Sequence, residues 1–374
     1  MISCILGTRA QLIKMAPVLL ALQKRNIPTE LILTGQHKET MQELADNFGL
    51  TAPPKYLYKG PEISGIFSML GWFTKLLIQA AIRSPFDKNS QMVLVHGDTL
   101  STLLGALAAK FRKIPVAHIE SGLRSHNIFH PFPEELTRIA VFNLCDIAYC
   151  PGEWAYQNME KYHLTKINTH SNTLIDALSI AIKNSTNDAK PDEKTSYCVC
   201  SIHRFENIFF RKRLEFIVEQ VITASKKTKV LFVLHPATRK QLIKNKLIKR
   251  LESNNIELLP RMGYIDFISL IRKAKFVITD GGGNQEELSY LNIPTILMRK
   301  TTERKEGIGS NVTISNYDPT LISSAIDMAC TSTIKKTMDN LDYLPSDTIA
   351  SHIADHIESK INGNTFQRKP ASRL

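Results

Sequence analysis

The sequence predicts an α/β protein with two domains, each built on a doubly wound parallel sheet. Its 374 residues are too many for one ordinary hydrophobic core, and two domains of about 150 to 200 residues are expected at this length. Short apolar runs alternate with longer helical stretches in both halves, which is typical of parallel sheets covered by helices on both faces. These observations indicate two Rossmann-like domains with a ligand cleft between them.

The individual elements follow from this alternation. Strands are expected in the first half at Ile2–Leu6, Leu31–Thr34, Met92–His96, Val116–Glu120 and Ile147–Cys150. Amphipathic stretches between them, such as Ile13–Lys24 and Leu100–Arg112, predict helices. The second half repeats the pattern, with strands expected at Tyr197–Ile202, Val230–Leu234, Ile256–Leu259, Phe276–Thr279 and Thr295–Met298.

The domain boundary is expected between His170 and Lys194. The stretch Asn184–Lys194 is polar and lacks periodicity, which predicts a surface loop. We place the hinge near Ser171, which gives an N-terminal domain over residues 1–170 and a C-terminal domain over residues 171–374. The last helix is expected to pack back on the first domain.

Composition argues against several classes of protein. No basic segment followed by an apolar core and a cleavage site begins the sequence, so no signal peptide is expected. Six scattered cysteines form no CxxC pair and are expected to be buried free thiols, which suits a reducing cytoplasm. The apolar stretch Ser64–Ile82 contains Lys75 and two glycines, so we expect a buried or dimer-interface helix rather than a membrane span.

The chain is strongly basic, with a formal net charge of +12 and a pI of about 9.3. Much of the excess lies in Arg211 to Arg250 and in the tail from Gln367 to Leu374. No zinc finger or aromatic-glycine RNA motif accompanies these charges, so no nucleic-acid partner is expected. Solvated helix faces account for them, and any membrane contact is expected to be peripheral.

Three carboxylates follow neighbouring predicted strands of the first half. Asp98 follows the third strand, Glu120 ends the fourth, and Glu134 stands shortly after it. Because parallel strands end at one edge of their sheet, these side chains are expected to converge and to suit proton transfer. Two structural alternatives remain open: a carboxylate that caps a loop, and an ion pair between Glu134 and Arg138 across one helical turn.

Features typical of phosphate sites occur in both halves. Gly7, Thr8 and Arg9 follow the first strand and begin a helix that contains Lys14, where the backbone can approach an anion. In the second half, three consecutive glycines at 281–283 open a predicted helix and present backbone N–H groups suited to a diphosphate.

Further polar residues of the second half follow its predicted strands. Glu287 lies one turn into the glycine-led helix and can accept hydrogen bonds from ribose hydroxyls, while Arg304 follows the next strand and matches phosphate geometry. His203 and Arg204 follow one strand, and His235 follows another. A nucleotide-diphosphate site is therefore predicted in this half.

Eight motifs occur in one order along the chain: GTRAQLIKMAPV, TGQHKETM, VHGDTLSTLLGALAA, HIESGLR, PFPEELTR, SIHRFEN, DGGGNQEE and TTERKEG. Together they resemble the signature set of the non-hydrolysing, bacterial type of UDP-N-acetylglucosamine 2-epimerase. Each motif is weak singly, but eight in order are specific, and the resemblance runs from Gly7 to about Val312. It implies the two-domain fold shared with GT-B glycosyltransferases.

The resemblance implies roles residue by residue. The family's acid/base carboxylates match Asp98, Glu120 and Glu134, its following arginine matches Arg138, and the histidine of its HRREN motif matches His203. The expected UDP-sugar contacts are Arg9, Lys14, Gly281, Gly282, Gly283, Glu287 and Arg304. Some members bind a second UDP-GlcNAc as an activator, at positions that match Gln36, Arg204, Glu206 and His235.

The sequence departs from the family pattern at five positions. Ala10 and Gln11 replace a proline and a glutamate, Phe205 replaces the second arginine of HRREN, Gly281 replaces a serine, and Ser171 replaces a glycine. The acid/base groups are unaffected, whereas the phosphate and regulatory surroundings are changed.

The activity implied is reversible epimerisation at carbon 2 of UDP-GlcNAc, giving UDP-ManNAc as a precursor for surface polysaccharide. UDP is eliminated to leave 2-acetamidoglucal and is added back after protonation from the other face, a route that needs no metal, nicotinamide or other cofactor. UDP-GlcNAc and UDP-ManNAc are the expected partners, and the enzyme is expected to be a cytoplasmic homodimer. A GT-B glycosyltransferase using a UDP-sugar, a hydrolysing epimerase that releases ManNAc, and a non-catalytic UDP-sugar sensor are the alternatives.

Overall fold

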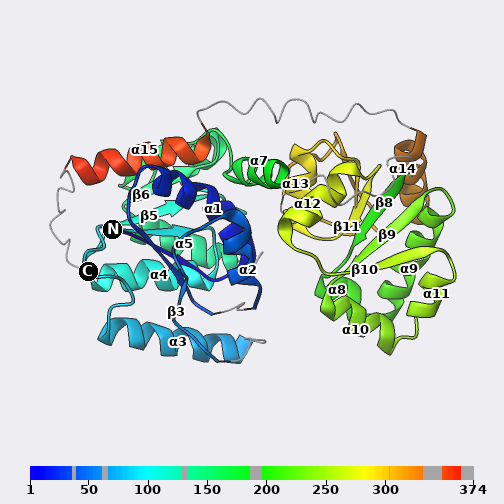
Figure 1. Cartoon of the computed structure of the whole chain (residues 1–374), viewed down its shortest axis with the longest axis horizontal. Helices are drawn as coiled ribbons and strands as arrows, with labels where there is room; N and C mark the ends of the chain where they lie inside the picture. Colours follow the sequence, from blue (N-terminus) through cyan, green and yellow to red (C-terminus); the bar gives the residue numbers. More distant parts are fainter. Residues whose placement is uncertain are drawn as a thin grey trace. The chain divides into compact units, whose positions relative to one another are not determined.

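The computed structural model describes residues 1–35, 39–60, 66–128, 133–185, 196–302, 304–331 and 348–363. The chain forms two compact units (Figure 1). Unit 1 comprises Met1–Ala177 and Pro345–Leu374, and unit 2 comprises Leu178–Leu344. The units divide inside helix α7 (Leu174–Asn184) rather than between residues 170 and 171. The loop expected over Asn184–Lys194 lies almost entirely outside the described residues.

Unit 1 contains a seven-stranded parallel sheet in the order β3-β2-β1-β4-β5-β6-β7. Its strands are β1 (Ile2–Leu6), β2 (Thr29–Leu33), β3 (Lys55–Tyr56), β4 (Met92–His96), β5 (Val116–Ile119), β6 (Ile147–Cys150) and β7 (Thr165–Asn168). Its helices are α1 (Arg9–Lys24), α2 (Glu39–Phe48), α3 (Ile66–Ile82), α4 (Leu100–Phe111), α5 (Glu134–Leu144), α6 (Glu153–Asn158), the start of α7, and α15 (Ile349–Asn362). The strand order reverses between β1 and β4, where doubly wound sheets bind ligands.

Local sequence explains the first strand and helix of unit 1. All five side chains of β1 are buried, as expected of a central parallel strand covered on both faces. Thr8 caps α1: its hydroxyl accepts the Gln11 N–H at 3.3 Å, and the Gln11 side chain accepts the Thr8 N–H at 3.1 Å. This capping box fixes the turn from β1 to α1 at the carboxyl edge of the sheet.

Unit 2 contains a six-stranded parallel sheet in the order β10-β9-β8-β11-β12-β13. Its strands are β8 (Tyr197–Ser201), β9 (Lys229–Leu234), β10 (Ile256–Pro260), β11 (Val277–Thr279), β12 (Thr295–Leu297) and β13 (Val312–Ile314). Its helices, beside the end of α7, are α8 (Phe205–Ile208), α9 (Arg211–Ser225), α10 (Pro236–Lys244), α11 (Ile248–Glu252), α12 (Tyr264–Lys273), α13 (Gly282–Tyr290) and α14 (Pro319–Thr331). The order reverses between β8 and β11, so the predicted doubly wound α/β class is confirmed in both units.

Helix α15 packs against unit 1, far from its neighbours in sequence. Arg25, at the end of α1, pairs with Asp355 at 2.5 Å. Asp176 accepts the N–H of Ala350 at 2.7 Å, at the start of α15. The last described helix is therefore part of the same compact unit as the N-terminal sheet.

The start of α15 gives a pH-dependent prediction. Burial raises the pKa of Asp176 from 3.8 to about 6, against the opposing effect of N–H groups from Ala350 and Ile349. Because folding favours the protonated form, the stability that this group contributes is present below about pH 4 and is lost as the pH rises through about 6. Asp176→Asn keeps the acceptor and removes the charge, so we expect it to raise stability at neutral pH by up to about 3 kcal/mol.

Melting temperatures of the wild type and of Asp176→Asn, measured at neutral pH and near pH 4, check this expectation. The difference should disappear at the lower pH, because both side chains are then uncharged. A variant that is less stable than the wild type at neutral pH would contradict it.

The apolar stretch Ser64–Ile82 forms helix α3 over its described part, Ile66–Ile82. Trp72, Leu76 and Ala80 bury one face of this helix, whereas Leu70, Ile78 and Ile82 are 52%, 56% and 80% exposed. No helix among the described residues is both long and apolar enough to cross a bilayer.

Candidate active site

The loops that follow β4 and β5 carry two of the three predicted acid/base carboxylates. Asp98 lies in the turn between β4 and α4, and Glu120 follows β5 directly. Glu120 has a φ of 61°, in the left-handed region that a non-glycine residue seldom adopts. Gly97 has a φ of 65° and lies close enough that a Cβ there would be 3.5 Å from the Glu120 carboxylate. Such backbone strain is concentrated at functional sites.

Glu120 is a buried carboxylate whose neighbours include Lys14, Asn172 and His96. Lys14 Nζ and Asn172 Nδ2 each lie 2.5 Å from Glu120 Oε1, and His96 Nε2 lies 3.5 Å from Oε2. The side chains of Lys14, Glu120 and His96 are 6%, 9% and 3% exposed. A charge so far from solvent needs such partners, because desolvation would otherwise favour its protonated form.

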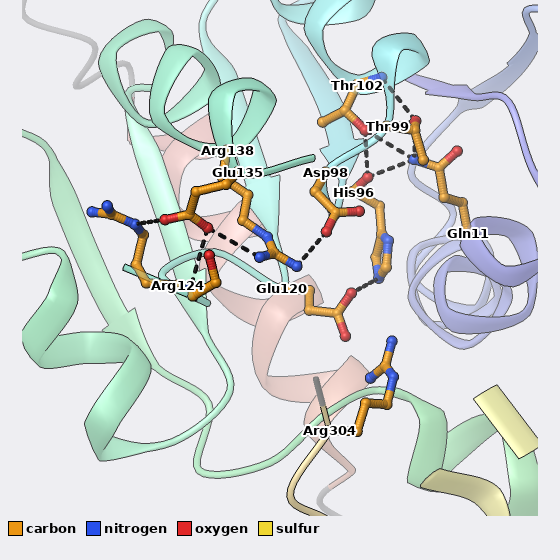
Figure 2. A network of polar contacts seen from close by, with 12 residues as sticks. Gln11, His96, Asp98, Thr99, Thr102, Glu120, Arg124, Glu135, Arg138 and Arg304 are labelled. Atoms are coloured by element: carbon orange, nitrogen blue, oxygen red, sulfur yellow. Dashed lines mark hydrogen bonds and ion pairs between the residues drawn. The ribbon is translucent and has the colours of Figure 1, made fainter. Parts of the chain in front are cut away.

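Within unit 1, a chain of ion pairs connects Asp98 to Arg138, Glu135 and Arg124 (Figure 2). Arg138 donates to Asp98 Oδ2 at 2.5 Å and to Glu135 Oε2 at 3.1 Å. Arg124 donates to Glu135 Oε1, and the Ser125 N–H donates to Glu135 Oε2 at 3.0 Å. The structure thus pairs Arg138 with Asp98 and Glu135, in place of the Glu134 pair that sequence spacing left open.

Glu135 is a structural anion of this chain. Its side chain is completely buried, and burial alone would raise its pKa. The N–H of Ser125 and the guanidinium groups of Arg124 and Arg138 outweigh burial and lower the pKa of Glu135 to about 2. A charged Glu135 therefore fixes Arg138, which in turn fixes the Asp98 carboxylate.

Glu134 is the first residue of α5, and its hydrogen bonding differs from that of the next residue, Glu135. The Oε2 atom of Glu134 is buried and has no hydrogen-bond partner in the part of the chain that the structure describes. Buried polar atoms are almost always paired, so an unpaired carboxylate oxygen is suited to meet a ligand.

Gln11 joins the loop after β1 to the loop after β4. Its oxygen accepts the N–H groups of Gly7 and Thr8 at 2.9 and 3.1 Å. Its amide nitrogen donates to the His96 carbonyl at 2.6 Å and to the hydroxyls of Thr99 and Thr102 at 3.1 and 2.9 Å. Gln11, which replaces a glutamate of the family pattern, is therefore a buried residue that connects the two loops through hydrogen bonds to their backbone.

In unit 2, buried Asp280 organises the loop that contains His203. One Asp280 oxygen accepts the His203 N–H at 3.0 Å and lies 3.4 Å from His203 Nδ1. The other accepts the Arg204 N–H and Asn207 Nδ2, both at 2.9 Å. The ring of His203 remains partly exposed at the end of β8.

The glycine-led helix lies beside this histidine. Gly281 is the N-cap residue of α13, and a Cβ at this position would lie 2.9 Å from His203 Cε1. The glycine that replaces the family's serine therefore leaves room for the imidazole in this position. A Cβ at Gly283 would meet nothing within 4 Å, so the first turn of the helix is open to a ligand.

Helix α13 also carries three adjacent polar side chains. Glu287 is nearly buried, and its carboxylate raises the pKa of Tyr264, which burial has already raised. Arg304 donates to buried Glu286 at 2.5 Å. Gln285 donates to the carbonyls of Arg304 and Glu306 at 3.2 and 3.0 Å, which ties the TTERKEG loop to the helix.

The residues predicted for a second sugar-nucleotide site are only partly brought together. Arg204 pairs with Glu206 at 2.6 Å, and the rings of His203 and His235 have centroids 6.0 Å apart, all within unit 2. Gln36 lies outside the described residues. Arg9, which is expected to contact the UDP-sugar substrate rather than the second ligand, is the first residue of α1 in unit 1.

Sequence reasoning assigned no role to several residues that organise these sites, namely His96, Asn172, Glu135, Asp280 and Glu286. Glu135 lies in PFPEELTR and its partner Arg124 in HIESGLR, while Asp280 and Glu286 lie in DGGGNQEE. The contacts of these residues depend on distant strands. Among the described residues, no group of three or more histidine, cysteine or acidic side chains is arranged to hold a metal ion.

Comparison with known proteins gives a consistent result. Residues 20–358 match the family model described as UDP-N-acetylglucosamine 2-epimerase. The chain is 34% identical over 344 residues to the UDP-N-acetylglucosamine 2-epimerase of Methanocaldococcus jannaschii, covering 86% of this chain and 90% of that protein.

Solved structures agree with the sequence comparison. The Methanocaldococcus jannaschii UDP-GlcNAc 2-epimerase in complex with UDP-GlcNAc and UDP superposes with a TM-score of 0.77 at 30% identity, over 96% of this chain and 99% of that one. The Neisseria meningitidis enzyme bound to UDP-GlcNAc gives a TM-score of 0.76 at 28% identity, over 97% and 100%. The chain therefore belongs to the UDP-N-acetylglucosamine 2-epimerase family.

Proposed function

We propose that the chain interconverts UDP-GlcNAc and UDP-ManNAc by eliminating and re-adding UDP, and so supplies a precursor for surface polysaccharide. The observation that carries the proposal is the polar cluster of unit 1, in which Glu120, Asp98 and Glu134 differ in their partners. Relatives of this family have been solved with UDP-GlcNAc and with UDP bound.

The chemistry explains why several carboxylates are needed. The hydrogen on carbon 2 is not acidic, since no carbonyl adjoins that carbon, so removing it must be coupled to departure of UDP from carbon 1. A carboxylate takes the proton, the C1–O bond breaks, and its electron pair leaves with UDP. In the reverse direction a second acid protonates carbon 2 from the opposite face while a UDP oxygen forms the new bond to carbon 1.

In unit 1, the surroundings of each carboxylate suit different parts of this task. Lys14 forms an ion pair with Glu120 and Arg138 forms one with Asp98, whereas Glu134 Oε2 has no such partner among the described residues. Groups with unlike surroundings can divide the roles of acid and base between them.

In unit 2, the groups beside the glycine-led helix suit the leaving diphosphate. The N-terminal N–H groups of α13 and the imidazole of His203 are donors, and Asp280 holds that imidazole in place. Donors arranged before reaction stabilise the charge that develops on a leaving group.

The test is to incubate the protein with UDP-GlcNAc alone in deuterium oxide and follow the products by proton NMR. We expect UDP-ManNAc that carries solvent deuterium on carbon 2. UDP with free ManNAc would indicate a hydrolysing epimerase, and no turnover without an acceptor sugar would favour a glycosyltransferase. Epimerised product without deuterium at carbon 2 would exclude the elimination route.

A homodimer and a cytoplasmic location are part of this proposal. The exposed apolar residues of α3, Leu70, Ile78 and Ile82, support contact with a second copy. The six cysteines are free thiols and five are buried, which suits a reducing compartment.

We further infer that activation by a second UDP-GlcNAc is weakened in this chain. Arg204, Glu206 and His235 are retained, but Phe205 replaces a family arginine. Phe205 is 63% exposed, and its phenyl ring has no donor for a phosphate. Initial rates that depend hyperbolically on UDP-GlcNAc would agree with this inference.

A further inference from the structure

Unit 2 concentrates most of the net positive charge of the chain in one segment. Residues 204–250 contain thirteen lysines and arginines against three glutamates, a net charge of +10, whereas the whole chain carries +12. The three glutamates, Glu206, Glu215 and Glu219, each pair with an arginine of the same segment. The remaining charge creates a positive potential that attracts polyanionic surfaces.

Three phenylalanines of this segment are exposed to solvent. Phe205, Phe209 and Phe210 are 63%, 49% and 59% exposed. The rings of Phe205 and Phe209 stack with centroids 4.6 Å apart, and Phe210 meets Phe205 edge-on at 6.1 Å, so the three form one apolar cluster. Arg211 and Lys212 follow directly and are exposed as well. We call these five residues the aromatic–basic patch.

Helix α10 extends this surface. It contacts α8, and Figure 1 shows both helices at the same end of unit 2. Its exposed side chains include Arg239, Lys240, Ile243 and Lys244, and Ile243 is 58% exposed. Residues four apart lie on one helix face, so this face also combines an apolar side chain with cations.

We propose that this face of unit 2 docks on an anionic lipid bilayer. Phe205, Phe209 and Phe210 enter the headgroup region, where aromatic rings gain by leaving water, and the adjoining cations pair with lipid phosphates. Single-stranded nucleic acid fits the patch less well, because bases stack on free ring faces whereas Phe205 and Phe209 stack on each other. The proposal does not depend on the catalytic activity.

Co-sedimentation of the full-length protein with lipid vesicles tests the proposal. We expect binding to phosphatidylcholine vesicles that contain phosphatidylglycerol, little binding to phosphatidylcholine alone, and weaker binding as salt is added. The double variant R211E/K212E should lower the partition coefficient at least about tenfold. Phe205→Ser combined with Phe209→Ser should lower it by a similar factor, since two apolar rings are removed.

The control is K88E/K161E, which changes the net charge equally at two exposed lysines of unit 1. It should lower binding less than about twofold, because neither lysine belongs to the aromatic–basic patch or to helix α10. Circular dichroism and melting temperatures establish that each variant is folded. Phe205→Gln alone replaces the double phenylalanine variant if that one does not fold.

Several outcomes would overturn the proposal. These are equal binding to neutral and anionic vesicles, binding to neither, or a loss in K88E/K161E as large as in R211E/K212E. Binding of single-stranded RNA that the patch variants abolish, without vesicle binding, would assign the surface to nucleic acid instead.

Discussion

Glu134→Gln is expected to lower the rate of UDP-GlcNAc epimerisation about a hundred- to ten-thousand-fold, the usual contribution of a general acid or base. The amide keeps the size of the side chain but cannot take up or release a proton at the reacting carbon. The fold should tolerate the change, because Glu134 Oε2 has no hydrogen-bond partner among the described residues. We therefore expect an unchanged or slightly higher melting temperature.

Initial rates by proton NMR, together with thermal unfolding, measure both quantities on one preparation. Retention of UDP binding in the variant would place the defect in the proton-transfer step. A clear loss of stability with nearly normal turnover would instead show that Glu134 has a structural role.

Glu135→Gln, one residue along the same helix, is expected to have the opposite profile. Removing one partner of a buried ion pair typically costs about 3–5 kcal/mol of stability, because the remaining charge is left uncompensated. Here two guanidinium groups, those of Arg124 and Arg138, lose their shared carboxylate. We expect a marked fall in the free energy of unfolding, and a secondary loss of turnover because Arg138 also holds Asp98.

The pH dependence separates charge from packing in this variant. The pKa of Glu135 is lowered from 4.5 to about 2 in the folded protein. Its charge therefore stabilises the wild type above about pH 4.5, and that stabilisation is lost as the pH falls towards 2. Chemical unfolding at neutral and acidic pH should show the difference between wild type and variant shrinking in this window. A difference that is independent of pH would indicate a packing defect.

Much of the architecture could be predicted because it depends on local patterns. The strands expected at Ile2–Leu6 and Met92–His96 have those same bounds in the structure, since each is a mainly apolar run that is followed directly by a glycine. The glycines at 281–283 likewise predicted a helix start, and α13 begins at Gly282. The boundary between the two units has no local sequence signal, because α7 continues across it and α15 returns to unit 1.

The sequence by itself determined the fold class, the order of the motifs and the family, because each depends on residue types at fixed spacing. Only the tertiary structure decided what the two glutamates of PFPEELTR do. Adjacent residues of a helix point about 100° apart, so Glu135 turns to Arg124 and Arg138 while Glu134 does not. In the same way, Glu120 meets Lys14 and Asn172 only because the strand order brings β1, β5 and the chain after β7 to one edge of the sheet. Such contacts join residues more than fifty positions apart, and no local pattern encodes them.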